Sequence, residues 1–190
     1  MPPPLRVENV ASEVLESHDR VLKLDYRGAP QTVGVMRDAA LSSQEHLSVR
    51  QLAEEICQGV ASKDYASEYL AIYYHVLGRT RYMRDPRTVE LVKAPHVVAT
   101  DLLLGKVPSL DCDDLAALIA ALILTVGGEP EFVTVAFKNQ FFNGERQYSH
   151  VFCRAREPRT KEYVVLDPVS AEKTHEMFSR IRAAKVWAVA

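Results

Sequence analysis

Residues 111–128, DCDDLAALIAALILTVGG, decide the fold of this chain. Asp111 is a suitable N-cap, and residues 115–126 are apolar on nearly every side, which predicts a helix buried in the centre of a domain. Gly127-Gly128 predicts the end of that helix. The apolar run is about a dozen residues long, whereas a bilayer span needs roughly 20, so the helix is predicted to lie in a protein core.

Upstream of this helix the sequence predicts three further helices, over residues 48–60, 64–77 and 95–104. Ser48 is the predicted N-cap of the first, because Gln51 three residues later completes a capping-box pattern. Gly78 and Gly105 are predicted to end the other two helices.

Nearer the N-terminus, residues 21–26 alternate between apolar and polar, which predicts a strand that Gly28-Ala29-Pro30 ends. Residues 31–41 are ambiguous, with a short helix preferred. After the central helix, strand-like segments cover 132–137, 147–155 and 161–167, followed by a short helix after 172 and a last strand near 186–189.

Helices followed by antiparallel strands predict an α+β fold with a helical N-terminal half. A chain of 190 residues fits a single domain over residues 1–190. We expect its core to cover about residues 48–170. Residues 1–20, which include a run of three prolines, are expected to form a loosely ordered extension.

The composition is that of an ordinary globular protein, with 47% hydrophobic and 25% charged residues. The net charge of −2 argues against nucleic acid or an anionic membrane as the main partner, because such binders carry a basic excess. The opening residues MPPPLR show no basic-then-apolar signal pattern, so a cytoplasmic location is expected. No cofactor is predicted.

The chain has three cysteines, an odd and small number that does not suggest a disulfide framework. Cys112 lies in the first turn of the central helix, where backbone N–H groups lower the pKa of a thiol and can hold an oxyanion. The carboxylates of Asp111, Asp113 and Asp114 oppose this effect, because like charge raises the pKa of the thiol. One solution is that Asp111 caps the helix while Asp114 faces a basic partner.

His150 and Asp167 are the predicted partners of Cys112. A hairpin folded symmetrically about Pro158-Arg159 places His150 directly opposite Asp167, on one face of the sheet. The carboxylate can then fix the imidazole tautomer and leave the other ring nitrogen for the thiol. Cys153 has the opposite strand parity to His150, so it is a poor alternative nucleophile.

A divalent metal site is the alternative reading of the same acidic residues. Hard carboxylates suit Mg²⁺, Mn²⁺ or Ca²⁺, and His150 could join Asp111, Asp113 and Asp114. Adjacent residues at the start of a helix fan outward and rarely converge on one ion, so no metal ligand is predicted.

Three motifs occur in order, GKVPSLDCDDLAAL at 105–118, SHV at 149–151 and VLDP at 165–168, with RYMRDP at 81–86 before them. Their order and spacing resemble the bacterial and phage transglutaminase-like superfamily of cysteine enzymes, over about residues 49–168. The resemblance implies a papain-like core, in which a Cys-bearing helix packs on an antiparallel sheet.

The resemblance gives each candidate residue a role. Cys112 becomes the nucleophile, His150 the general base and acid, and Asp167 the orienting carboxylate. Tyr82 is the candidate for completing an oxyanion hole. The other support candidates are the flanking carboxylates Asp111, Asp113 and Asp114.

The preferred function is a cysteine hydrolase, a protease or amidase that cleaves a peptide or carboxamide bond of a protein or peptide substrate through a thioester. The first alternative is a module that keeps the fold without turnover, in a phage or prophage virion with other virion or assembly proteins as partners. The second is a crosslinking transglutaminase, in which a lysine amine replaces water. The chain has no large insertion of the kind found in multidomain crosslinkers, which favours hydrolysis.

Overall fold

The structure is a computed structural model that describes residues 22–24, 29–85, 90–142, 144–169 and 174–190. The expected N-terminal extension, residues 1–20, and Gly28 of the expected turn lie outside the described residues, whereas Ala29 and Pro30 begin α2. Of the strand expected over residues 21–26, the described part forms β1, Leu22–Leu24.

The helices alternate with short strands in the first two thirds of the chain, and longer strands follow. The described helices are α2 (Ala29–Ser43), α3 (Leu47–Cys57), α4 (Tyr65–Arg79), α5 (Pro95–Leu103), α6 (Cys112–Thr125) and α7 (Thr174–Arg180). The described strands are β1, β2 (Arg81–Tyr82), β3 (Glu90–Val92), β4 (Ser109–Leu110), β5 (Pro130–Ala136), β6 (Phe141–Phe142), β7 (Glu145–Arg146), β8 (His150–Arg156), β9 (Tyr163–Leu166) and β10 (Ala183–Ala188).

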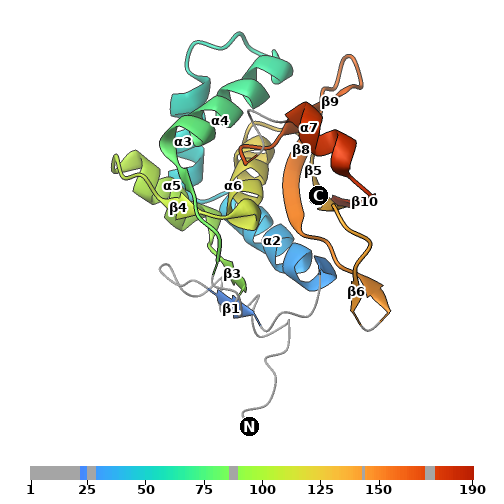
Figure 1. Cartoon of the computed structure of the whole chain (residues 1–190). Helices are drawn as coiled ribbons and strands as arrows, with labels where there is room; N and C mark the ends of the chain where they lie inside the picture. The colour runs from blue at the N-terminus through green and yellow to red at the C-terminus, as the bar shows by residue number, and fades with distance from the viewer. Residues whose placement is uncertain (1–21, 25–28, 86–89, 143, 170–173) are drawn as a thin grey trace.

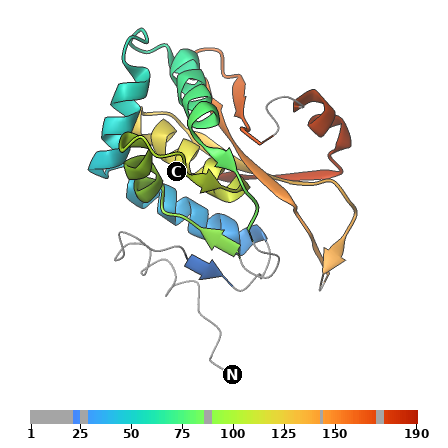
Figure 2. The same ribbon diagram turned by 60° about the vertical axis from the view of Figure 1, so that its left-hand side comes forward.

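The main sheet is antiparallel, with the strand order β10-β5-β8-β9 among the described residues. Helices α2 to α6 lie on one face of this sheet and α7 lies on the other (Figures 1 and 2). The predicted order of helices followed by an antiparallel sheet is therefore confirmed.

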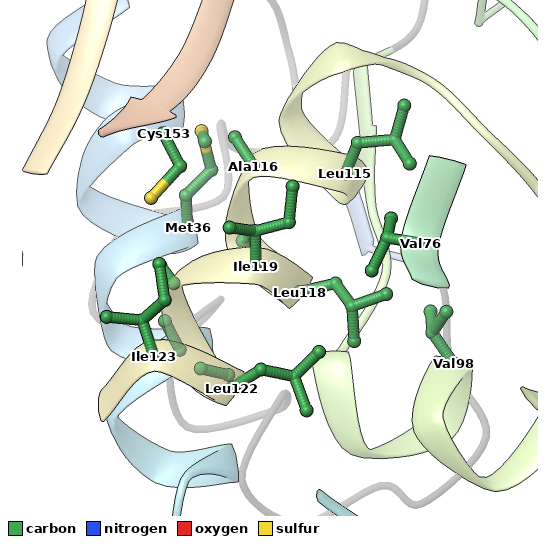
Figure 3. Packing of buried hydrophobic residues seen from close by; sticks show 14 of the residues in the cluster. Met36, Val76, Val98, Leu115, Ala116, Leu118, Ile119, Leu122, Ile123 and Cys153 are labelled. Atoms are coloured by element: carbon green, nitrogen blue, oxygen red, sulfur yellow. The ribbon is translucent and has the colours of Figure 1, made fainter. Parts of the chain in front are cut away.

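Helix α6 is the centre of the molecule, as its apolar sequence predicts. Eleven of its 14 residues are buried, and it packs against α2, α3, α4, α5, β5 and β8. Figure 3 shows Leu118, Ile119 and Leu122 of this helix among side chains from neighbouring elements, including Met36 of α2 and Cys153 of β8. Helix α6 is thus fixed in place by contacts with other helices and with the sheet.

The cap of α3 differs from the prediction. His46, not Ser48, is the N-cap, and its Nδ1 accepts a hydrogen bond from the backbone N–H of Ser48 at 3.4 Å. The Ser48 hydroxyl instead donates to the backbone oxygen of His96 in α5 at 2.9 Å. The Ser48 hydroxyl, which the capping-box pattern predicted to cap α3, thus forms a hydrogen bond between α3 and α5 instead.

Two other helix limits also differ. Gly78 does not end α4, which continues to Arg79, and the hydroxyl of Thr80 then donates to the backbone oxygen of Val76 at 2.8 Å. The ambiguous segment 31–41 belongs to a 15-residue helix, α2. Pro30 lies in the first turn of α2, where its missing N–H costs no hydrogen bond.

The hydrophobic core extends beyond the expected range of 48–170 on both sides. Met36 and Ala39 of α2 are fully buried in it, and so is Val189, which follows β10.

Among the described residues, no helix combines the length and apolar character that crossing a bilayer requires.

Candidate active site

Cys112 is the first residue of α6 and follows directly on the N-cap, Asp111. The carboxylate of Asp111 accepts a hydrogen bond from the backbone N–H of Asp114 at 3.3 Å, in the capping role that the sequence predicts. The Cys112 side chain is half-buried and packs against the edge of the main core. The helix start therefore supplies the partial positive charge that stabilises a thiolate.

Tyr82 lies next to this helix start. Strands β2 and β4 pair in parallel with Tyr82 opposite Leu110, and the backbone N–H of Met83 donates to the Leu110 oxygen at 2.8 Å. Partial burial raises the pKa of the Tyr82 phenol, the Cys112 thiolate adds to this effect, and a hydrogen bond from Arg84 opposes it. The phenol is thus close enough to Cys112 to feel its charge, and it remains 43% exposed.

Asp114 is buried, and Lys93 is its basic partner. Its Oδ1 accepts from the backbone N–H of Lys93 at 2.6 Å, and its Oδ2 lies 3.4 Å from the Lys93 ammonium. Burial, together with the charges of Asp111 and Asp85, raises the pKa of Asp114 to about 7 against the opposing effect of the contacts with Lys93. The Lys93 ammonium therefore offsets part of the negative charge that the carboxylates place around Cys112.

The same contacts bear on the alternative of a metal site. The carboxylate oxygens of Asp111, Asp113 and Asp114 lie within 4.8 Å of one another, and all three residues are buried. Both oxygens of Asp114 face Lys93, and Oδ1 of Asp111 accepts a backbone amide. Both oxygens of Asp114 and one oxygen of Asp111 are thus already engaged by an ammonium ion or by backbone amides.

His150 and Asp167 form a buried hydrogen-bonded pair. Nε2 of His150 and Oδ2 of Asp167 are 2.8 Å apart, and the two residues are 9% and 2% exposed. The other carboxylate oxygen accepts from the backbone N–H of Val169 at 3.1 Å, and the Tyr73 hydroxyl donates to the Asp167 backbone oxygen at 3.4 Å. This fixed carboxylate can select one tautomer of the imidazole, which leaves Nδ1 as the second nitrogen.

The hairpin that joins these two residues has a different register from the predicted one. Cys153 pairs with Leu166, so the turn is centred one residue later than Pro158-Arg159, and His150 is not directly opposite Asp167. Continued by one pair, this register sets Asp167 opposite Phe152. Because the offset is two residues, both side chains keep the same face of the sheet, and they meet on the diagonal.

His150 lies at the start of β8 and shares its sheet face with Val135, its partner on β5. Its ring stacks with Phe137 at 6.4 Å and approaches Phe152 at 6.1 Å, both in the smaller apolar cluster that α7 covers. The alternate residues Val151 and Cys153 face α6 in the main core.

The predicted site residues form two groups in the structure. One group is Tyr82, Asp111 and Cys112 at the start of α6, and the other is His150 with Asp167. Helix α6 packs against β8 on the sheet face that carries Val151 and Cys153, whereas the ring of His150 lies beside Phe137 and Phe152 in the cluster that α7 covers. Cys112 packs against the main core cluster. This cluster contains Val151, which follows His150 in the sequence, and Leu166, which precedes Asp167.

The other two cysteines lie in different surroundings, and none of the three, all described, forms a disulfide. Burial, with the charge of Glu68, raises the pKa of Cys57 to about 11. Cys153 is fully buried, and burial together with Glu131 also raises its pKa. Both thiols are therefore protonated at neutral pH, and Cys153 is a packing residue, as its strand parity predicts.

No protein-family model matches the chain, and no curated protein matches it. Among solved structures, a proposed protease from Parabacteroides distasonis aligns with a TM-score of 0.55 and 14% identity, over 86% of this chain and 30% of that protein. The chain has the fold of a proposed protease. A proposed cysteine protease from Cytophaga hutchinsonii aligns with a TM-score of 0.45 and 15% identity, over 73% of this chain and 45% of that protein. At this identity the first likeness establishes the fold alone.

Sequence reasoning missed two residues of this candidate site, Lys93 and Arg84. Lys93 follows a three-residue strand with no pattern of its own. The available signal was the excess of carboxylates around Cys112, which requires a cation. Arg84 lies two residues after Tyr82 in an extended segment, so alternation puts both side chains on one side.

Proposed function

We propose that the chain is a transglutaminase-like cysteine hydrolase, a protease or amidase that uses Cys112, His150 and Asp167. The observation that supports it most is the buried hydrogen bond of 2.8 Å between His150 and Asp167, in a domain whose central helix begins with a cysteine. A buried imidazole held by a carboxylate is the unit that activates a thiol in papain-like enzymes.

In the proposed reaction the Cys112 thiolate attacks the carbonyl carbon of a peptide or carboxamide bond. The tetrahedral oxyanion receives hydrogen bonds from backbone N–H groups at the start of α6 and from the Tyr82 hydroxyl. The imidazolium of His150 gives its proton to the leaving nitrogen, and a thioester with Cys112 remains. Water, deprotonated by His150, then attacks the thioester, which releases the carboxylic acid and returns the thiol.

Arg84 strengthens the role proposed for Tyr82. Its hydrogen bond to the phenol opposes the rise in pKa that burial and Cys112 cause. A phenol that accepts a bond from a guanidinium is a better donor, because hydrogen bonds in a chain polarise one another. Tyr82 would thus be the side-chain donor of the oxyanion hole.

Labelling with iodoacetamide, followed by peptide mass spectrometry, tests this function without a known substrate. At pH 7, Cys112 should react roughly tenfold or more faster than Cys57, whose pKa of about 11 keeps it a thiol. His150→Ala should remove the advantage of Cys112 over Cys57, whereas Cys57→Ser should leave the labelling rate of Cys112 unchanged.

The opposite outcome would favour the second candidate function. Equally slow labelling of all three cysteines would mean that the flanking carboxylates prevail over the helix start. The chain would then be a binding or structural module that keeps the fold, and Cys112→Ala would leave its biological role intact. A crosslinking transglutaminase differs from a hydrolase only in the acceptor, so amine incorporation into a glutamine peptide would distinguish the two.

A further inference from the structure

Three segments meet beside Cys112 through one lysine. Lys93, directly after β3, presents its backbone N–H and its ammonium to the carboxylate of Asp114, at 2.6 and 3.4 Å. The same ammonium donates to the backbone oxygen of Ser109 in β4 at 2.5 Å. We call Asp114, Lys93 and Ser109 the Lys93 clamp.

The Lys93 clamp holds the chain on both sides of Cys112. Ser109 precedes the cysteine by three residues and Asp114 follows it by two. The N–H of Asp114 also binds the N-cap Asp111, so the segment from β4 to the first turn of α6 is closed into a ring of contacts. Strand β4 also carries the pairing that positions Tyr82.

The clamp holds a single cation against several carboxylates. Asp114 is 2% exposed, and the charged groups that act on it are Asp111 of the helix cap, Asp85 after β2 and Lys93. Asp113, the neighbouring residue of the same turn, is also buried. Oδ2 of Asp85 accepts the backbone N–H of Leu91, which ties its carboxylate to β3 as well.

We propose that the Lys93 clamp is a proton-controlled device that positions Cys112 for reaction: ionised Asp114 closes it, and protonation of Asp114 releases the ammonium. The inference rests on the proposed function and adds its regulation by pH. The pKa of Asp114, raised to about 7 by burial and by Asp111, lets the carboxyl gain or lose its proton near neutrality. Asp114 is a positioning residue, because it acts on Cys112 through the helix start.

The pH profile of Cys112 labelling between pH 5 and 9 tests the clamp. In the wild type the rate should contain a rise near pH 7 that Asp114→Asn removes. Lys93→Met should also remove this rise, because ionised Asp114 then has no ammonium to hold and the contact with Ser109 is lost. The matched control is Asp101→Asn, which breaks the exposed pair of Asp101 and Lys106 at 2.6 Å and should keep the wild-type profile.

Amide hydrogen exchange of residues 109–115 is a second readout, which needs no reactive thiol. Protection of these residues in the wild type, corrected for intrinsic exchange and taken relative to the rest of α6, should increase through pH 7, and in Asp114→Asn it should not. Coincident labelling profiles of the wild type and Asp114→Asn would overturn the inference. If Cys112 never reacts faster than Cys57 while the exchange behaves as expected, the proposed hydrolase fails and the clamp stands as a structural device.

Discussion

Both carboxylate oxygens of Asp167 have hydrogen-bond partners. One oxygen lies 2.8 Å from the imidazole of His150, and the other accepts the N–H of Val169 at 3.1 Å. The Tyr73 hydroxyl fixes the backbone of the same residue. A carboxylate held this way orients a ring and stabilises its protonated form, which is the role that a thiol–imidazole pair requires.

Replacing Asp167 with asparagine should slow the labelling of Cys112 by roughly tenfold, because a neutral amide stabilises imidazolium less than a carboxylate does. The amide keeps the size of the side chain, so the melting temperature serves as the check on folding. Asp101→Asn, at an exposed carboxylate, is the control and should label at the wild-type rate. An unchanged rate in Asp167→Asn would remove Asp167 from the site.

At the level of single residues, sequence reasoning selected as candidates the residues with a distinctive chemical type or setting. Cys112, His150 and Asp167 stood out through their spacing, and Asp111 through its place before an apolar helix. Lys93 could not be identified in this way. Its role depends on two contacts with residues 16 and 21 positions away, which only the packed structure shows.

At the level of elements, the hairpin of β8 and β9 explains why the register was wrong. The turn is built around Glu157, whose carboxylate accepts the backbone N–H groups of Arg159 and Thr160, and these bonds lower its pKa. Lys161 has a positive φ of 64° and closes the turn by donating its N–H to the Glu157 oxygen at 2.9 Å. Glu157 and Lys161 are not residues that usually indicate such a turn. The assumption that the hairpin is symmetric about Pro158-Arg159 therefore gave the wrong register.

The end of α6 carries a stability prediction. A Cβ at Gly128 would lie 2.6 Å from both Cγ2 of Ile123 and the hydroxyl of Tyr69. Gly128→Ala should therefore lower the free energy of unfolding by about 1–3 kcal/mol, because the core must shift to admit the methyl group.

Gly78 supplies the matched control for this prediction. It lies in α4 with nothing within 4 Å of an added Cβ. Gly78→Ala should leave stability unchanged or raise it by up to about 1 kcal/mol. Urea unfolding of both variants measures the difference, and a Gly128→Ala protein as stable as Gly78→Ala would contradict the packing argument.

At the level of the whole molecule, local patterns gave the elements but not all of their partners. Strand β10 was expected near residues 186–189, and the structure pairs it with β5, Trp187 opposite Phe132. Trp187 and Phe132 are more than 50 residues apart in the sequence, so local sequence does not reveal this pairing. The small hairpin of β6 and β7 was missed because its strands have two residues each.

Asp114 should also make the stability of the whole protein depend on pH. Its pKa rises from 3.8 to about 7 on folding, so the folded state binds the proton more tightly than the unfolded chain does. Stability contributed by the neutral carboxyl is fully present below pH 4 and is lost as the pH rises to about 7.

The Asp114→Asn variant has no carboxyl at this position to ionise, so it should not lose this stability as the pH rises. The free energy of unfolding of the variant, relative to the wild type, should increase between pH 4 and 8 by on the order of 4 kcal/mol. Urea unfolding at both pH values provides the comparison. If the free energies of unfolding of the variant and the wild type differ by the same amount at both pH values, the pKa of Asp114 is the same in the folded and the unfolded chain, which contradicts the prediction.

Helix α6 has almost no surface of its own, since 11 of its 14 residues are buried among helices on several sides and the sheet. In evolutionary terms, the sequence of such a helix can change very little. A change in the volume of any buried side chain shifts the rigid helix as a whole and so displaces its first turn. Neutral variation should gather on the exposed faces of α3, α4 and β10. Variants that abolish reactivity should include many in the body of α6 that touch no reacting atom.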